Sequence, residues 1–134
     1  MELHLNLIGF ILVVLSIIHV TFPKRFNWKD ELKPLSLLNK ELMYVHTFFI
    51  ALVILLNGLL CIFCADDLVH TNLGKQISLG LFIFWFFRLA FQFFGYSSKL
   101  WKGKTFETAV HIVFTILWTY LVIIFLMIYL GKSI

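Results

Sequence analysis

Four long apolar stretches divide the chain, and each is about as long as a membrane-crossing helix needs to be. We expect membrane-spanning helices over residues 3–22, 41–65, 76–96 and 105–130. Pro23 should end the first of them, because proline cannot continue a helix, and Thr105 should be the N-cap of the last. A helix crosses the hydrocarbon core of a bilayer with about 20 apolar residues. The connectors between the stretches are short and polar. The pattern therefore predicts an all-α integral membrane protein, in which residues 1–134 form a single four-helix transmembrane domain, an antiparallel bundle.

The composition excludes a water-soluble domain of this size. Hydrophobic residues make up 61% of the chain and charged residues only 13%. Soluble domains are about 45–50% apolar and about 25% charged. We therefore expect the lipid bilayer to be the main partner. The net charge of +4 lies mostly in two connectors and predicts membrane orientation, not nucleic-acid binding.

The positions of the basic residues predict that both termini lie outside. The first and third connectors together hold eight Lys and Arg residues, whereas Lys75 and Lys132 are the basic residues of the second connector and the C-terminus. Short loops rich in Lys and Arg stay on the cytoplasmic side. We therefore expect an N-out, C-out multi-pass protein of a bacterial inner (cytoplasmic) membrane.

Arg88 lies inside the aromatic run of residues 83–94, and no other charged residue occurs within ten positions on either side. A guanidinium at the centre of a spanning helix costs at least about 2.5 kcal/mol on insertion scales. Such a residue normally faces a partner, a cavity or a ligand. Trp85 and Gln92 fall on the same helical stripe as Arg88, at i, i+3 and i, i+4 spacing.

Three histidines lie near the predicted cytoplasmic ends of three different spans, namely His19, His46 and His111. At 1.5 Å per residue they lie roughly 5–10 Å below the cytoplasmic edge of the membrane, at about the depth of Gln92. Glu107 comes one turn before His111 on the same face of the last span. The shared depth allows these side chains to converge inside a bundle.

Convergence would create a cofactor site. Neutral imidazole is a common ligand of transition metals, and two histidines on facing helices can hold a haem b. We therefore predict a cofactor-binding site of His19, His46, His111, Arg88, Gln92 and Trp85, and a metal-binding set of His19, His46, His111 and Glu107. Arg88 would neutralise a haem propionate or the oxygen of a reduced quinone. The leading hypothesis is a haem b or transition-metal protein with a redox or electron-transfer role.

The same residues allow other interpretations. Whether the protein is an enzyme is also left open by the sequence. An ionisable layer also suits a proton-coupled or ion-conducting transporter or channel. The large aromatic surface suits an accessory subunit of a larger membrane complex, or a homo-oligomer. Structural readings compete as well: each histidine alone is typical of a hydrogen-bonded interfacial residue, and Arg88 would stabilise the bundle by pairing with Glu107.

Two further motifs give weaker indications of a function. Cys61 and Cys64 form a CxxC at the end of the second span, but no basic residue beside them would stabilise a thiolate, which favours helix packing over redox chemistry. Residues 103–105 match only the end of a P-loop, because the required first glycine is replaced by Ser98. We therefore expect no nucleotide binding. Asn57 and Gly58 are predicted to form a helix-packing or hydrogen-bonding point.

Overall fold

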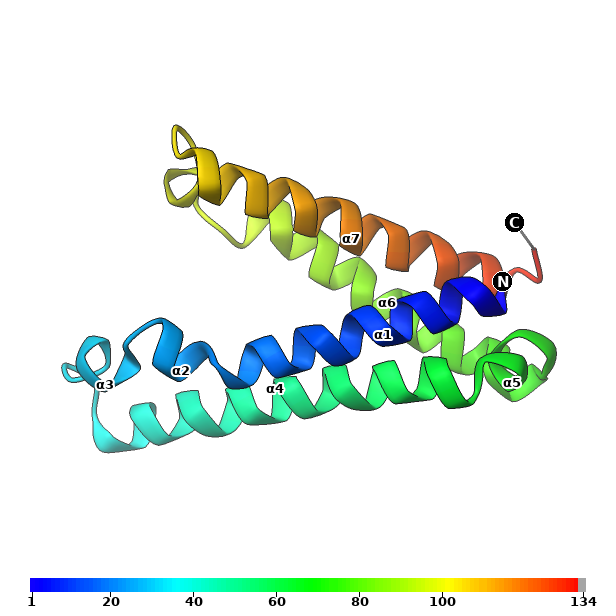
Figure 1. The fold of residues 1–134 in the computed structure, drawn as a ribbon, viewed down its shortest axis with the longest axis horizontal. Coiled ribbons are helices and arrows are strands. Elements are labelled where there is room, and N and C mark those ends of the chain that lie inside the picture. The colour runs from blue at the N-terminus through cyan, green and yellow to red at the C-terminus, as the bar shows by residue number, and fades with distance from the viewer. Residues whose placement is uncertain (133–134) are drawn as a thin grey trace. The chain divides into compact units, whose positions relative to one another are not determined.

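The computed structural model describes residues 1–132, whose regular elements are all helices, with no strand among them. Its long helices are α1 (Glu2–Val20), α4 (Leu37–Phe63), α6 (Asn72–Phe94) and α7 (Thr105–Tyr129), and all four are long and apolar enough to cross a membrane (Figure 1). The short helices are α2 (Phe22–Arg25), α3 (Trp28–Glu31), α5 (Ala65–His70) and the 3-10 helix η1 (Ser98–Leu100). The predicted all-α fold is confirmed, and the four long helices are long and apolar enough to cross a membrane.

Two of the long helices begin four residues earlier than the spans predicted for them, at residues 37 and 72 instead of 41 and 76. α4 begins at Leu37, because the hydroxyl of Ser36 accepts a hydrogen bond from the Asn39 N–H at 3.3 Å. α6 begins at Asn72, because the hydroxyl of Thr71 accepts one from the Gly74 N–H at 2.8 Å. A capping hydroxyl satisfies a free N–H of the first turn, so each helix extends by about one turn beyond its predicted start.

Two expectations about helix ends are corrected. Pro23 was expected to end the first span, but α1 ends at Val20 and Pro23 lies in the first turn of α2. The first turn tolerates proline because its N–H would have no intrahelical partner there. Thr105 was expected to be the N-cap of the last span, but it is the first residue of α7, and Lys104 occupies the cap position without a side-chain hydrogen bond.

The chain divides into two compact units, and the single four-helix bundle stays a prediction. The unit of residues 3–65 contains α1 and α4, which approach closely at two glycines. A Cβ added to Gly9 would lie 2.6 Å from the Gly58 carbonyl oxygen, and one added to Gly58 would lie 2.8 Å from the Gly9 carbonyl oxygen. Small residues let helix backbones approach in this way. The predicted packing role of Gly58 is confirmed.

The other unit contains residues 1–2 together with α5, α6 and α7. α6 and α7 lie side by side as a hairpin (Figure 1). The rings of Trp85 and Trp118 stack between them, with centroids 5.1 Å apart and an interplanar angle of 14°. Both tryptophans are fully buried. This stacked pair packs α6 against α7 in the buried part of the hairpin.

Candidate functional site

Arg88 is half-buried in the α6–α7 hairpin and its guanidinium lies against aromatic rings. The guanidinium carbon is 4.9 Å from the ring centroid of Trp118 and 5.8 Å from that of Tyr96. Both distances are within the range of a cation–π interaction, about 6 Å. Within residues 1–132 no carboxylate forms an ion pair with Arg88, and Glu107 is exposed. The structural pairing of Arg88 with Glu107 is therefore not formed.

A hydrogen-bond relay connects Arg88 to His111 through Gln92. Arg88 Nη1 donates to Gln92 Oε1 at 3.3 Å, and Gln92 Nε2 lies 3.0 Å from His111 Nδ1 and 3.5 Å from the His111 carbonyl oxygen. A guanidinium can only donate and a carbonyl oxygen can only accept, so these two ends fix the orientation of the buried Gln92 amide. His111 Nδ1 must then accept a hydrogen bond. The neutral ring consequently carries its proton on Nε2.

Aromatic and hydroxyl groups hold the His111 ring in place. Trp101 stacks on it with centroids 4.6 Å apart and an interplanar angle of 12°, and Phe93 contacts its edge at 6.4 Å. The hydroxyl of Thr108 donates to the Trp101 carbonyl oxygen at 2.6 Å, which ties the loop carrying Trp101 to α7. The imidazole is therefore oriented from several sides before any ligand arrives.

The hairpin contains more buried hydrogen-bond donors than it satisfies. The indole Nε1 atoms of Trp85 and Trp118 are buried without a hydrogen-bond partner in the described part of the chain, as is the hydroxyl of Ser78. An indole N–H can only donate. A buried donor without an acceptor is unfavourable by about 1–3 kcal/mol. Trp118 lies against the guanidinium of Arg88 and Trp85 stacks on Trp118, so this part of the hairpin has several donors near one another and favours an acceptor.

His19 and His46 have the opposite tautomer. His19 Nδ1 lies 3.0 Å from the Leu15 carbonyl oxygen, and His46 Nδ1 lies 2.8 Å from the Leu42 carbonyl oxygen. A carbonyl only accepts, so Nδ1 is protonated in both rings and Nε2 keeps its lone pair. A histidine that bonds a carbonyl through Nδ1 is set up to ligate a metal through Nε2.

The structure brings part of the predicted site together. Arg88, Gln92 and His111 are joined by hydrogen bonds, and Trp85 joins them through its stacking on Trp118. His19 and His46 belong to the unit of residues 3–65, so a site shared by all three histidines stays a prediction.

Two residues that complete the arrangement were not included in the predicted site. Trp118 shares the helical stripe of His111, and that spacing was a usable signal. Trp101 lies in the basic third connector, where its only signal was that it is an aromatic residue beside the end of a span.

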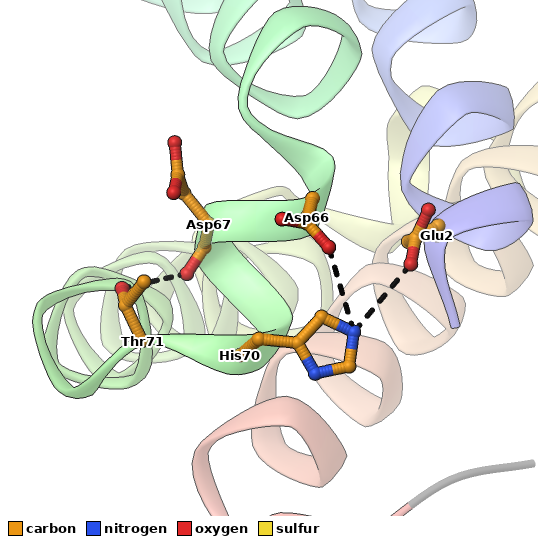
Figure 2. A network of polar contacts seen from close by, with 5 residues as sticks. All are labelled: Glu2, Asp66, Asp67, His70 and Thr71. Carbon is orange, nitrogen blue, oxygen red and sulfur yellow. Dashed lines mark hydrogen bonds and ion pairs between the residues drawn. The ribbon is translucent and has the colours of Figure 1, made fainter.

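A second polar cluster contains none of the predicted ligands. Within residues 1–132, the one group of at least three His, Cys, Asp or Glu side chains with ligand atoms close enough for a common metal ion is Glu2, Asp66 and His70 (Figure 2). Sequence reasoning missed this group, although the i, i+4 spacing of Asp66 and His70 was a signal. No protein-family model, curated protein or solved structure matches the chain. Function must therefore be argued from the chemistry of these sites.

Proposed function

We propose that this chain is a multi-pass membrane protein that binds the oxygen-bearing ring of a quinone in the α6–α7 hairpin, with Arg88 as its anchor. One observation supports this most directly: the half-buried guanidinium of Arg88 contacts aromatic rings and an amide, but no carboxylate within residues 1–132. A charge in an apolar setting needs compensation from a partner or a ligand. Quinone oxygens accept hydrogen bonds, and they become negatively charged on reduction.

The surrounding groups match this ligand class. His111 offers an Nε2–H donor whose direction is fixed by Gln92 and Trp101. The rings of Trp118 and Tyr96 flank the guanidinium and can pack against a flat aromatic ligand. A guanidinium interacts much more strongly with a developing negative charge in a low-dielectric site than in water. Arg88 would thus favour the reduced form of the quinone and support a redox role.

The same proposal gives the site a place in the membrane. In the N-out, C-out orientation, the loop after α6 faces the cytoplasm with Lys99, Lys102 and Lys104. Gln92 and His111 then lie roughly 5–10 Å below the cytoplasmic edge, with Arg88 one turn deeper. A bacterial inner membrane, which carries quinones, would be the matching location.

Tryptophan fluorescence tests the proposal, because Trp85, Trp101 and Trp118 surround the site. The purified full chain in detergent is titrated with a short-chain ubiquinone and a short-chain menaquinone analogue, and quenching is followed. We expect saturable quenching whose affinity falls at least tenfold, about 1.4 kcal/mol, in Arg88→Gln. The matched control is Lys99→Gln, which removes an exposed positive charge from the following loop. Equal affinity in Arg88→Gln and the unaltered protein would overturn the proposal.

A second candidate, haem b or a transition-metal ion held by His19 and His46, is favoured by their tautomers. Both rings have Nδ1 bonded to a carbonyl and Nε2 free to ligate. His111 has its Nε2 protonated, so it is the matched control. A Soret band that disappears in His46→Gln and persists in His111→Gln would support this candidate. Colourless protein, with no iron or other metal by elemental analysis, would remove it.

A further inference from the structure

Three ligand-type side chains, those of Glu2, Asp66 and His70, meet outside the Arg88 site, with Asp66 and His70 both on α5. The Nε2 atom of His70 lies 3.5 Å from Glu2 Oε1 and 3.6 Å from Asp66 Oδ1. Their ligand atoms all lie within 4.8 Å of one another. Figure 2 shows the same ring nitrogen facing both carboxylates, whereas the carboxylate of the neighbouring Asp67 points away.

The spacing of these atoms suits metal coordination better than hydrogen bonding. Ordinary N–H···O bonds join heavy atoms at about 2.7–3.2 Å, which is shorter than both separations. Two ligands that each lie about 2.0–2.1 Å from a tetrahedral zinc ion are roughly 3.3 Å apart. The observed separations of 3.5 and 3.6 Å are close to this edge length. Two of the three pairs are thus spaced like ligands of one ion, and the third pair lies within 4.8 Å.

The charges around the cluster also favour a cation. Residues 65–74 include Asp66 and Asp67 but no Lys or Arg. The ion pairs of Glu2 and Asp66 within the described residues both go to His70, which is charged only when protonated. Two carboxylates held this close repel each other once the imidazole is neutral. A divalent cation would balance their charge at neutral pH.

Hydrogen bonds between the Thr71 side chain and nearby backbone groups hold the turn that carries the ligands. Asp66 and His70 are one helical turn apart on α5, so they share a face. The hydroxyl of Thr71 donates to the Asp67 carbonyl oxygen at 2.7 Å and accepts from the Gly74 N–H at 2.8 Å. A Cβ at Gly74 would collide with that same Asp67 carbonyl, so only glycine allows α6 to start here.

From these observations we propose that Glu2, Asp66 and His70 bind one divalent transition-metal ion. A mixed imidazole and carboxylate set suits Zn²⁺ and similar ions, whereas Mg²⁺ and Ca²⁺ prefer oxygen ligands alone. The side chains are well exposed, with relative accessibilities of 52% for Glu2, 79% for Asp66 and 62% for His70. An ion can reach them, and water can complete its coordination. This site is independent of quinone binding at Arg88.

The test uses the full chain in detergent, stripped with a chelator and titrated with Zn²⁺ by calorimetry at pH 7.5. We expect one ion per chain. Asp66→Asn and His70→Gln should each lower the affinity by at least about tenfold, since even residues that only support a ligand contribute that much. The matched control is Asp67→Asn, whose carboxylate points away from the cluster (Figure 2). Arg88→Gln should leave zinc binding unchanged, which separates the failure of this proposal from that of the quinone site.

A spectroscopic readout identifies the ligands directly. Bound Co²⁺ should show visible absorption bands that change in His70→Gln and stay the same in Asp67→Asn and His46→Gln. If the cluster is only an ion pair of a protonated His70, no saturable uptake of either metal will occur. That result would overturn the proposal, as would zinc binding that is unaffected by His70→Gln.

Discussion

The ring of Trp118 lies against the guanidinium of Arg88, with 4.9 Å between the guanidinium carbon and the ring centroid. A desolvated cation–π contact contributes about 2 kcal/mol. Insertion scales place the cost of a central arginine at roughly 2.5–3.5 kcal/mol. The contact with Trp118, the hydrogen bond to Gln92 and the ring of Tyr96 therefore offset part of the cost of Arg88. No carboxylate within residues 1–132 balances its positive charge.

A double-mutant cycle measures this contact. Trp118→Leu should destabilise the protein more when Arg88 is present than in an Arg88→Met background, because only the first case loses a cation–π interaction. We expect a coupling energy of about 1–2 kcal/mol from equilibrium unfolding in detergent followed by circular dichroism. Phe114→Leu is the control, since Phe114 stacks on Trp118 at 5.4 Å but has no contact of this kind with Arg88. A coupling energy near zero would contradict the assigned contact.

The histidine tautomers can be read by ¹⁵N NMR. We expect His111 to be protonated on Nε2 and both His19 and His46 to be protonated on Nδ1, because their hydrogen-bond partners differ. Gln92→Leu removes the donor to His111 Nδ1 and should change the nitrogen signals of His111 alone. His19 is the internal control, since its Leu15 partner is untouched. An Nδ1-protonated His111 in the unaltered protein would show that the relay is wrongly oriented.

The glycine contact between α1 and α4 gives a matched pair of substitutions. Gly9→Ala places a methyl group 2.6 Å from the Gly58 carbonyl oxygen, so the helices must separate. Overpacking of this kind costs about 1–3 kcal/mol. A Cβ at Gly80 on α6 meets nothing within 4 Å, so Gly80→Ala should be neutral or should stabilise by up to about 1 kcal/mol through helix propensity. Equal free energies of unfolding for Gly9→Ala and Gly80→Ala would refute the close contact between α1 and α4.

The connector after α1 should respond to acid through Asp30. Its hydrogen bond from Lys33, and secondly one from Asn27, lowers the pKa of the Asp30 carboxyl below its usual value. A lowered folded-state pKa means that the pair stabilises the loop above the ordinary aspartate pKa, and that this contribution is lost as pH falls through the lowered value. Lys33→Gln should return the carboxyl titration, followed by ¹³C NMR, towards the ordinary value. Lys29→Gln is the control and should leave it unchanged.

The hydrophobic pattern was sufficient to predict the long helices, because the length of an apolar run depends on the bilayer and not on tertiary contacts. The joint placement of Arg88 and Gln92 also followed from the sequence, since residues four apart share a helix face. The true starts of α4 and α6 did not follow from hydropathy, because the hydroxyls of Ser36 and Thr71 determine them.

Contacts between distant segments could not be predicted in the same way. The pairing of Gln92 with His111 depends on how α6 and α7 are aligned along each other, and side-chain packing such as the Trp85–Trp118 stack determines that alignment. The contact between Glu2 and His70 joins residues separated by about half the length of the chain. A histidine tautomer likewise depends on whichever partner the fold supplies, so no periodicity in the sequence reveals it.

The Gln92 amide can serve only one arrangement at a time. While Arg88 engages its oxygen, its nitrogen faces the imidazole and keeps the His111 proton on the far side of the ring. The carbonyl oxygen of His111 holds the same amide nitrogen, so the amide cannot turn over without setting two oxygens against each other. A ligand that met Arg88 would therefore find the imidazole proton already on the side from which it can be donated, and no rearrangement of protons would have to precede binding.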